Sequence, residues 1–390
     1  MKKGWQIKRL GDVCEFDKVQ GIHRGLPYVG LEHIEAHTAC FIGSSEPQPV
    51  KSSTFRFSSK HLLYGRLRPY LNKVLAPAFE GHCSTEIFPV KPCAQLMREF
   101  LLYWFLKPDT VDLIDSTCTG ARMPRANMQA VLSFDIPLPP LAEQQRIVSI
   151  LDEAFEKIAT AKANAEKNLQ NARALFESHL NDVFTKRGKG WVEKKLGDVC
   201  EFENGDRGKN YPNRKEYVES GIPWINTGHI CPDGSLSMEE MNFITRRKFD
   251  SLRSGKIQSG DLVYCLRGAT LGKTALVDPL TEGAVASSLV ILRPSSLVDA
   301  RFLYFFLTSP HGQGLIKGFE NGAAQPNLGA KSVSKYPILL PSLSVQREIA
   351  DSLIDLRTET QRLEAIYRQK LAALEALKKS LLDQAFAGGL

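Results

Sequence analysis

The stretch "WQIKRLGDVCEF" (Trp5–Phe16) returns later in the same chain as "WVEKKLGDVCEF" (Trp191–Phe202). Nine of the twelve positions are identical, and the two copies are separated by 186 residues in a chain of 390. A repeating unit of this length is far longer than a solenoid repeat, which spans about 20–45 residues. The sequence therefore predicts that each copy is a complete domain followed by an appendage.

The two halves of the chain stay in step after this opening phrase. The matching blocks are "LPYVGLEHIE" (26–35) with "IPWINTGHIC" (222–231), "SKHLLYGRLRPYLNKVL" (59–75) with "SGDLVYCLRGATLGKTAL" (259–276), "TGARMPRAN" (119–127) with "NGAAQPNLG" (321–329), and "IPLPPLAEQQRIV" (136–148) with "ILLPSLSVQREIA" (338–350). Because their order is the same in both halves, the chain is a tandem duplication.

Composition indicates an ordinary folded protein, with 43% hydrophobic and 24% charged residues. The longest apolar runs, such as "FLLYWFL" (Phe100–Leu106), are too short to span a bilayer, and no secretory signal is visible after "MKKGW". The eight cysteines lack paired spacings, and Cys14 and Cys200 have apolar neighbours typical of small core residues. We expect a cytoplasmic protein with reduced thiols and no membrane contact.

The positive charge lies in two separate blocks. The net charge is +4 over residues 1–140 and +5 over residues 186–341, whereas residues 141–185 carry −2 and residues 342–390 carry none. Two basic blocks suggest two contacts with a polyanion. Double-stranded DNA fits best, since half-sites a helical turn of about 34 Å or more apart suit a protein with two reading heads.

Within each copy the pattern is that of a mixed α/β domain. Short apolar runs bounded by glycine, proline and polar residues, such as "DLVYCL" (261–266), are typical of strands. Helical spacing over 96–106 and 302–307, with Asp299 as N-cap of the second, predicts helices. We predict an α+β fold with domains at 1–140 and 186–341, followed by helical spacers at 141–185 and 342–390.

The last segment of each copy carries apolar residues at alternating steps of four and three. In the first copy the defining positions are Ile147, Leu151 and Ile158. In the second copy they are Ile349, Leu353, Leu356 and Leu363, and the apolar stripe continues through Leu374, Leu377 and Leu381. This spacing without an internal proline indicates a coiled coil. Two matching stripes predict that the two helices pair with each other, antiparallel. The alternative for each stripe is an amphipathic helix packed on its own domain.

The layout resembles, over the whole chain, the specificity subunit of type I restriction-modification systems. The resemblance rests on the duplicated order of "KRLGDVCEF", "YVGLEHIE", "TGARMPRAN" and "IPLPPLAEQQRIV". It implies two target recognition domains, each reading one half of a split, asymmetric DNA site, and helical spacers that dock two methyltransferase subunits. It further implies that S-adenosylmethionine and adenine N6 methylation belong to those partners, and that restriction needs a further subunit. The alternative is a coiled-coil adaptor whose basic domains bind protein or RNA.

No catalytic or metal site can be assembled from the sequence. An amino-methyltransferase needs a glycine-rich cofactor loop and an Asn/Asp-Pro-Pro-aromatic stretch, and "PLPP" (Pro137–Pro140) lacks the polar and aromatic residues. "GATLGKTAL" (Gly268–Leu276) imitates a phosphate-binding loop but has three residues between its glycines, not four. His33 and His37 have metal-like spacing, but the second copy keeps only His229, so a structural histidine is the better interpretation.

Candidate DNA contacts are basic and aromatic residues interleaved with hydroxyl groups. They are Lys51, Arg56, Arg66, Arg68, Tyr70, Lys73, Arg122 and Arg125 in the first domain, and Arg207, Lys209, Tyr211, Arg214, Arg246, Arg247, Arg267 and Lys273 in the second. Arginine suits guanine edges, and lysine mostly holds phosphate. Regions that differ between the copies are the better candidates for base readout. Lys73 and Lys273, which the copies share, are the better candidates for phosphate contacts. A solvated loop residue is the alternative at each position.

Overall fold

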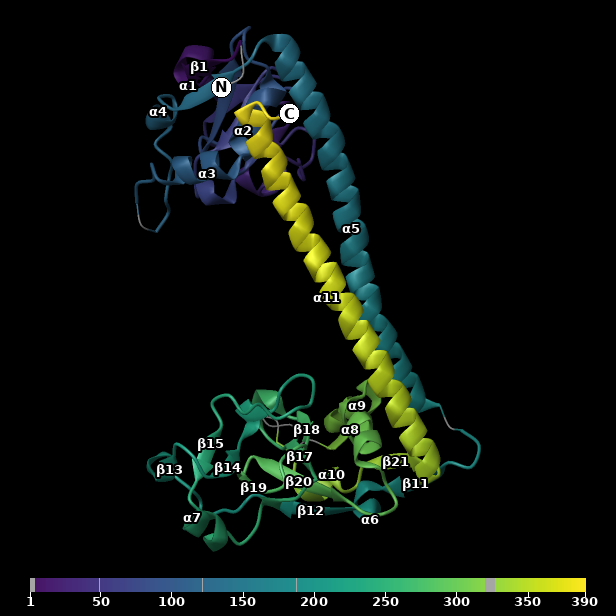
Figure 1. Ribbon diagram of the computed structural model, residues 1–390. Coiled ribbons are helices and arrows are strands. Elements are labelled where there is room, and N and C mark those ends of the chain that lie inside the picture. Colours follow the sequence, from purple (N-terminus) through teal and green to yellow (C-terminus); the bar gives the residue numbers. More distant parts are fainter. Residues whose placement is uncertain (1–3, 49, 121, 187, 320–326) are drawn as a thin grey trace. The chain divides into compact units, whose positions relative to one another are not determined.

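The computed structural model describes residues 1–390 except 1–3, 49, 121, 187 and 320–326. The chain forms two compact units, residues 1–167 with 368–390, and residues 168–367. Each unit contains the α/β domain of one copy together with part of two long helices, α5 (Leu141–Thr185) and α11 (Leu343–Ala387) (Figure 1). Both helices therefore contribute residues to both units.

The first domain runs from β1 to β10. Its strands are β1 (Gln6–Arg9), β2 (Cys14–Phe16), β3 (Gln20–Gly21), β4 (Tyr28–Val29), β5 (Thr54–Phe57), β6 (Leu62–Gly65), β7 (Val74–Leu75), β8 (Gly81–Cys83), β9 (Ile87–Pro92) and β10 (Asp135–Leu138). Its helices are α1 (Leu10–Val13), α2 (Arg98–Leu106), α3 (Pro108–Asp115), α4 (Met128–Val131) and the 3₁₀ turns η1 (Leu31–His33) and η2 (Pro69–Leu71).

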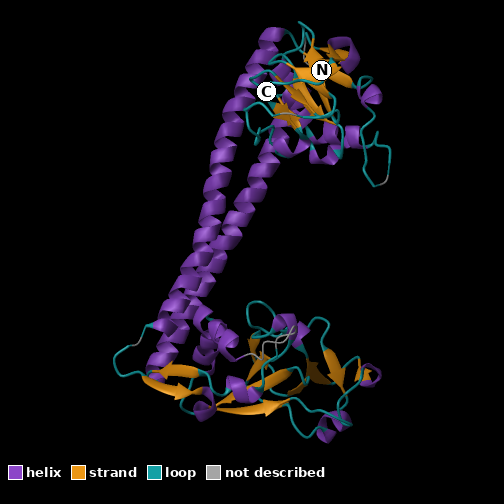
Figure 2. Cartoon of the chain, turned by 180° about the vertical axis from the view of Figure 1, so that it is seen from behind, coloured by secondary structure: helices purple, strands orange, loops and turns teal. Residues whose placement is uncertain are grey.

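The strands of the first domain pair into a sheet of order β2-β9-β6-β7 and a sheet of order β3-β5-β8-β4, while β1 pairs with β10. Figure 2 shows the strands of this domain in orange and its helices in purple. Helix α2 packs on the first of these sheets, where the rings of Tyr64 and Phe105 stack with centroids 4.6 Å apart. Every residue of β6 is buried. The apolar strand–helix contact is therefore the centre of this domain's core.

The second domain runs from β11 to β21. Its strands are β11 (Val192–Lys195), β12 (Cys200–Asn204), β13 (Tyr217–Val218), β14 (Ile222–Ile225), β15 (Asn242–Ile244), β16 (Lys256–Ile257), β17 (Leu262–Cys265), β18 (Thr274–Leu276), β19 (Gly283–Val285), β20 (Leu289–Pro294) and β21 (Pro337–Leu340). Its helices are α6 (Leu196–Val199), α7 (Arg246–Ser251), α8 (Ala300–Thr308), α9 (Pro310–Phe319), α10 (Ala330–Val333) and the 3₁₀ turns η3 (Arg214–Glu216), η4 (Thr227–His229) and η5 (Gly268–Thr270).

The duplication is visible in the strand pairing. The order β12-β20-β17-β18 repeats β2-β9-β6-β7, and β11 pairs with β21 as β1 pairs with β10. The shared cysteines of the opening phrase, Cys14 and Cys200, are both buried, and burial raises the pKa of each thiol to about 12. The opening phrase therefore starts the same sheet twice, and the predicted tandem duplication is confirmed.

The predicted cap of the second-domain helix is present. Oδ1 of Asp299 accepts hydrogen bonds from the main-chain N–H groups of Arg301 and Phe302, at 3.0 and 3.2 Å. These bonds satisfy donors that the first turn of α8 leaves without helical partners. The matching block "NGAAQPNLG" lies outside the described residues from 321 to 326.

Each long helix begins on its own domain with a buried glutamine. The side-chain oxygen of Gln144 accepts from the main chain of Met97 at 2.8 Å, and that of Gln346 accepts from the main chain of Asp299 at 2.9 Å. Each amide nitrogen also donates to two main-chain carbonyls. A fully bonded buried amide fixes the start of the helix against the domain, because losing any partner leaves a desolvated polar group.

The first unit pairs the beginning of α5 with the end of α11. Ile147, Leu151 and Ile158 of α5 are buried, as the heptad stripe predicts. Leu382 and Phe386 of α11 belong to the same core as the start of α5 and the first domain. The helices therefore pack both on each other and on the domain, which combines the predicted pairing with its alternative.

The second unit pairs the other halves of the same helices. Leu353 of α11 shares a core with Leu180 and Phe184 of α5, while Ile349 and Leu356 are half-buried. The start of one helix thus contacts the end of the other in each unit. The predicted antiparallel pairing is confirmed.

The prediction for Leu363 is wrong. Its side chain is 39% exposed, and Leu377 further along the predicted stripe is 47% exposed. After the buried Thr360 the contact line advances by four residues to Glu364, whose carboxylate lies 3.0 Å from the Arg173 guanidinium of α5. An ion pair between the helices therefore occupies the place that the apolar pattern assigns to leucine.

The pair of strands β4 and β8 in the first domain buries a polar side chain, whereas the matching pair β14 and β19 in the second domain buries an apolar one. His82 of β8 is fully buried, with Nδ1 3.0 Å from Oγ1 of Thr54 and its ring 5.9 Å from that of His23. At the matching place in the second domain, β14 and β19 pair Trp224 with Ala284. The first domain therefore holds an ionisable group inside a strand pair that could be apolar.

His82 predicts an acid-sensitive first domain. Burial lowers the pKa of His82, and main-chain hydrogen bonds offset this only in part. Unfolding exposes an imidazole with a pKa of about 6.5, so the unfolded chain takes up the proton more readily and stability falls as the pH drops below that value. In urea unfolding, the stability advantage of wild type over His82→Ala should shrink between about pH 8 and about pH 5.5. An advantage of equal size at both pH values would contradict this.

Candidate nucleic-acid interface

The two domains carry different side chains on one backbone frame. In the first domain, the main chain of Arg66 donates to Glu86 and accepts from Ala126, both at 2.9 Å. In the second domain, the main chain of Leu266 makes the same two bonds, also at 2.9 Å, with the residues at the matching places. This frame follows the last residue of the central strands β6 and β17 and joins three loops of each domain.

In the first domain the frame presents two arginines held by one carboxylate. Nε of Arg66 lies 3.0 Å from Oε2 of Glu86, and Arg125 contacts both oxygens of Glu86 at 2.9–3.1 Å. Burial raises the pKa of Glu86, but hydrogen bonds from Arg125 and Arg66 outweigh this and hold its pKa below the ordinary value. The cluster therefore stays ionised, keeps a net positive charge and presents preoriented guanidinium groups of the kind that suits guanine edges.

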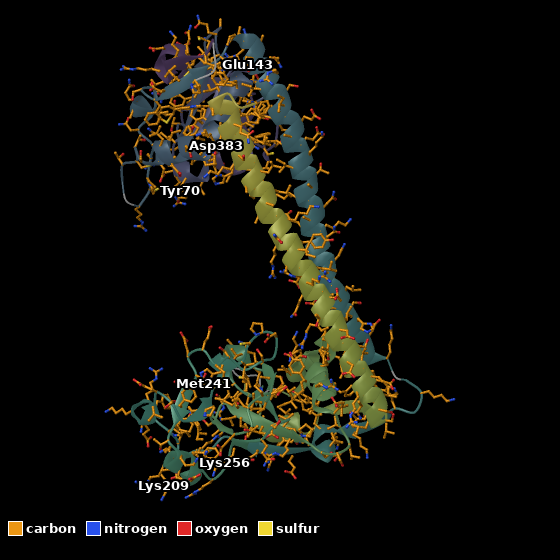
Figure 3. All side chains as sticks on the ribbon, in the orientation of Figure 1. Tyr70, Glu143, Lys209, Met241, Lys256 and Asp383 are labelled. Atoms are coloured by element: carbon orange, nitrogen blue, oxygen red, sulfur yellow. The ribbon has the colours of Figure 1, made fainter. Side chains whose placement is uncertain are left out.

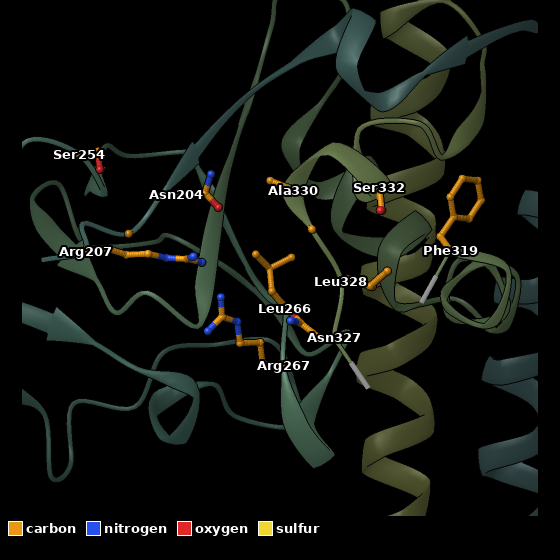
Figure 4. A pocket seen from close by; sticks show the side chains of 12 residues that line it. Asn204, Arg207, Ser254, Leu266, Arg267, Phe319, Asn327, Leu328, Ala330 and Ser332 are labelled. Carbon is orange, nitrogen blue, oxygen red and sulfur yellow. The ribbon is translucent and has the colours of Figure 1, made fainter. Parts of the chain in front are cut away.

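In the second domain the same frame borders a hollow of about 560 Å³. Leu266 and Asn327 replace the two arginines of the first domain, and the side chains of Arg207 and Arg267 are directed toward the same part of the pocket (Figure 4). Asn204 also lines it. The second domain thus offers amide groups beside two cations, a set of groups that suits an adenine edge beside phosphate.

Other first-domain candidates lie outside this cluster. Arg56 of β5 pairs with Glu80 at 3.4 Å between exposed side chains. The remaining candidates, Lys51, Arg68, Tyr70 and Arg122, are exposed. Figure 3 labels Tyr70 among them. Arg68 adopts a left-handed backbone with φ of 52°. This conformation costs a non-glycine residue about 1–3 kcal/mol and persists only where the surroundings enforce it. Because such strain gathers at binding sites, the loop around Arg68 is a place to test for DNA contact.

The second-domain candidates divide in the same way. Arg246 forms a bidentate pair with Glu282, at 2.5 and 2.6 Å, and lies over the ring of Phe249. Tyr211 is half-buried, with its ring edge-on to Trp224 at 5.3 Å, so it contributes to packing. The exposed candidates are Lys209, Arg214, Arg247, Arg267 and Lys273, of which Figure 3 labels Lys209.

The two shared lysines differ in their surroundings. Nζ of Lys73 donates to the main-chain carbonyls of Leu31 and Ile34, at 2.6 and 2.9 Å. Lys273 occupies the same place in the second domain, because its main-chain carbonyl accepts a hydrogen bond from the N–H of Cys265 as that of Lys73 accepts one from the N–H of Gly65. The side chain of Lys273, however, is exposed. The Lys73 ammonium is already bonded within its own domain, so the two lysines do not form an equivalent pair of phosphate contacts.

The acidic organisers of the site were missed by sequence reasoning. Glu86 and Glu282 each hold a candidate arginine, yet neither stands in a basic or aromatic run. The sequence signal that could have revealed Glu86 is its position one residue before β9, in "STEIFP", where the second domain has the uncharged Ser288. A search for basic residues alone does not use that signal.

The phosphate-loop and metal-site patterns have structural explanations. Lys273 of "GATLGKTAL" leads directly into strand β18, whereas a phosphate-binding loop leads into a helix. Nδ1 of His33 accepts from the main chain of Gly30, and Nδ1 of His229 accepts from that of Asn226, both at 3.1 Å. Both histidines therefore cap a turn of their own domain.

Family membership follows from a match in each copy. The type I restriction modification DNA specificity domain family matches residues 2–170 and 188–375. The chain belongs to this family. The family resemblance inferred from the sequence is confirmed. The two matched segments are the two recognition domains with their helices.

Two curated relatives match this chain over most of its length and most of their own. The chain is 22% identical to the type I restriction enzyme MjaVIII specificity subunit of Methanocaldococcus jannaschii, over 98% of this chain and 92% of the relative. It is 21% identical to the MjaIX specificity subunit of that organism, over 88% and 85%. The prediction of a non-catalytic specificity subunit is confirmed by this membership.

Solved structures show the same fold. A chain from a structure of the assembly and conformational transition of a type I restriction-modification system superimposes with a TM-score of 0.80 at 21% identity, covering 100% of this chain and 99% of that one. The HsdS subunit from Thermoanaerobacter tengcongensis gives a TM-score of 0.67 at 21% identity, with 100% and 98% covered. In the described part of this chain, no helix combines the length and apolar character required to cross a membrane.

Proposed function

We propose that this specificity subunit reads a split, asymmetric sequence in double-stranded DNA, one half with each recognition domain, and docks two methyltransferase subunits. Those partners bind S-adenosylmethionine and methylate adenine at N6, and a restriction subunit joins where the system has one. Membership of the type I family supports action with DNA and other subunits. The cytoplasm is the compartment in which such an assembly meets the chromosome.

The observation that carries this proposal is one backbone frame with two sets of side chains. Arg66 and Arg125 occupy the frame in the first recognition domain, and Leu266 and Asn327 occupy it in the second. A fixed frame holds a base-reading group at a constant place, while its chemistry decides which base is accepted. Unlike groups on like frames suit two unlike half-sites, whereas an adaptor for a repeated partner would gain nothing from them.

The test is base-resolved adenine methylation across the host genome, with this gene intact, deleted, and restored on a plasmid. Deletion should abolish methylation at one split, asymmetric motif, and restoration should return it. The motif itself supplies the two half-sites and their spacing. An unchanged methylome in cells that express the protein would refute the proposal and favour the adaptor that binds protein or RNA.

Lys273 should contact phosphate without reading sequence. Lys273→Ala should weaken binding of the assembled complex to all duplexes by a similar factor, because a phosphate contact carries no base information. The slope of log affinity against log salt should become shallower by about 0.9, the value for one phosphate that is no longer neutralised. Competition binding at several salt concentrations measures both, and a changed base preference would contradict the assignment.

Lys73 provides the matched comparison. Lys73→Ala removes the donor of two main-chain carbonyls, so we expect a loss of about 1–3 kcal/mol from the free energy of unfolding. The salt dependence of DNA binding should stay as in wild type when the folded variant is assayed. A shallower salt slope for Lys73→Ala would restore the view that both lysines hold phosphate.

A further inference from the structure

Each recognition domain has a short loop that contacts the long helix α11. It follows η1 in the first domain and η4 in the second, and an isolated bridge closes its base, between Ile34 and Phe41 or between Ile230 and Leu236. We call these segments, residues 34–41 and 230–236, the tip loops. Counted from the equivalent histidines of η1 and η4, the fourth residue is His37 in one and Asp233 in the other.

In the first unit the tip loop is bonded to a lysine of α11. Nζ of Lys378 donates to the carbonyl of His37 at 3.1 Å and lies 5.2 Å from the ring centroid of Phe155 on α5. The Phe155 ring in turn meets Tyr103 of α2 edge-on. The loop has a strained backbone, with φ of 63° at His37 and 61° at Ala39. Such a conformation persists where surrounding contacts enforce it.

In the second unit the same carbonyl position is bonded to an arginine of α11. Nη1 of Arg357 donates to the carbonyl of Asp233 at 3.1 Å, and the hydroxyl of Tyr304 donates to it at 2.9 Å. The guanidinium lies 5.2 Å from the ring centroid of Phe305. Hollows of about 590 and about 370 Å³ both include Asp233 and Arg357 in their walls. The contact therefore bridges a poorly filled gap between loop and helix.

Both cations belong to α11, which the duplication alone does not explain. Aligning the copies on their buried glutamines places Phe155 opposite Arg357 and Phe176 opposite Lys378. The cation therefore stands at the position equivalent to Phe176 in the first unit and at the position equivalent to Phe155 in the second. The bond from a cation to the tip-loop carbonyl is nevertheless present in both. Two different residue arrangements that keep one contact indicate that the contact itself matters.

We propose that Lys378 and Arg357 are positioning residues that fix each recognition domain on the helix pair and so restrict the number of base pairs between the half-sites. This rests on the proposed function. The buried glutamine and the shared apolar core hold each domain on the helices near the start of its own helix. The tip loop adds a contact farther along the helix pair, at the level of Phe155 in the first unit and of Arg357 in the second, each 11 residues beyond the glutamine. Together they hold the domain in one orientation.

The test uses charge-removing and conservative variants in the assembled methyltransferase complex. Lys378→Ala removes the contact in the first unit, and Arg357→Ala combined with Tyr304→Phe removes both donors in the second. Lys378→Arg and Arg357→Lys keep a cation and should restore wild-type behaviour. Lys370→Ala and Arg362→Ala remove exposed cations of the same helix and serve as matched controls.

The substrate is a plasmid library with the wild-type half-sites separated by the native spacer or by one base pair fewer or more. In the contact-removing variants, methylation of the off-length sites should rise about tenfold relative to the native site, a factor within reach of one charge-assisted hydrogen bond. Hydrogen exchange of the tip-loop amides should accelerate in the same variants. The controls and the conservative variants should match wild type in both measurements.

Three results would overturn the inference. Tip-loop amides that exchange faster while spacer selection stays as in wild type would show that the contact positions nothing. Equal loss of methylation at every spacer would assign the residues to folding or docking. A wild-type complex that methylates no split motif would remove the proposed function and the inference together, whereas the first two results leave the function intact.

Discussion

Replacing Phe386 with alanine should remove about 3–5 kcal/mol from the free energy of unfolding of the first unit, as expected for truncation of a buried aromatic ring. The side chain is 9% exposed, and its ring lies 4.8 Å from that of Phe100 in α2. It belongs to a core that also contains Leu382 of α11 and the start of α5. The truncation opens a cavity where the last turns of α11 close over the domain.

Urea unfolding followed by hydrogen exchange can assign this loss to one unit. Phe184→Ala is the matched variant of the second unit, since the Phe184 ring lies 5.1 Å from that of Phe302, and it should destabilise that unit by a similar amount. Leu377→Ala alters an exposed residue of the same helix and should change stability by less than about 0.5 kcal/mol. Equal unfolding of Phe386→Ala and Leu377→Ala would show that the end of α11 does not stabilise the domain.

Glu86→Gln should reduce discrimination at the first half-site while strengthening binding to unrelated DNA. The carboxylate holds Arg66 and Arg125 in place, and a neutral amide cannot accept from both guanidinium groups with the same strength. A misplaced bidentate arginine loses about 1–3 kcal/mol of discrimination against a wrong base. Removing the negative charge raises affinity for any phosphate backbone, because that term is electrostatic and sequence-independent.

Competition binding with duplexes altered in one half-site at a time separates the two effects. Discrimination at the second half-site should match wild type, because Ser288 takes the place of Glu86 in the frame of the second domain and carries no carboxylate. Glu80→Gln, which alters the exposed partner of Arg56, serves as a control for added charge alone. Unchanged discrimination at the first half-site would mean that Glu86 stabilises the domain and does not prepare it for base recognition.

Local patterns were enough to predict the elements that depend on few residues. The cap at Asp299, the strand within "DLVYCL" and the buried stripe through Ile147 and Leu151 follow from residue type and spacing. The tandem duplication was equally accessible, because it requires only the comparison of one half of the chain with the other. Each of these inferences uses information confined to a short window or to a repeat.

The remaining features depend on residues that are distant in sequence. Glu364 takes the inner position expected for Leu363 because Arg173 of the other helix neutralises it. Lys73 and Lys273 are identical in type and place, yet Nζ of Lys73 donates hydrogen bonds to two main-chain carbonyls whereas the side chain of Lys273 is exposed. Neither distinction is visible in hydrophobic spacing or in the count of charges, so the exact contact line and the division of the candidate site required the structure.

The first recognition domain is closed by residues that the ribosome adds after the whole second unit, residues 168–367. Leu382, Ala385 and Phe386 complete a core that begins with Trp5 and Leu10. At about 5–20 residues per second, synthesis of residues 168–390 takes roughly 10–45 s, during which the apolar surface beneath α11 stays uncovered. A nonsense mutation in the last turns of α11 would therefore damage the domain that precedes the second unit in the chain, while the sequence of the second unit remained whole.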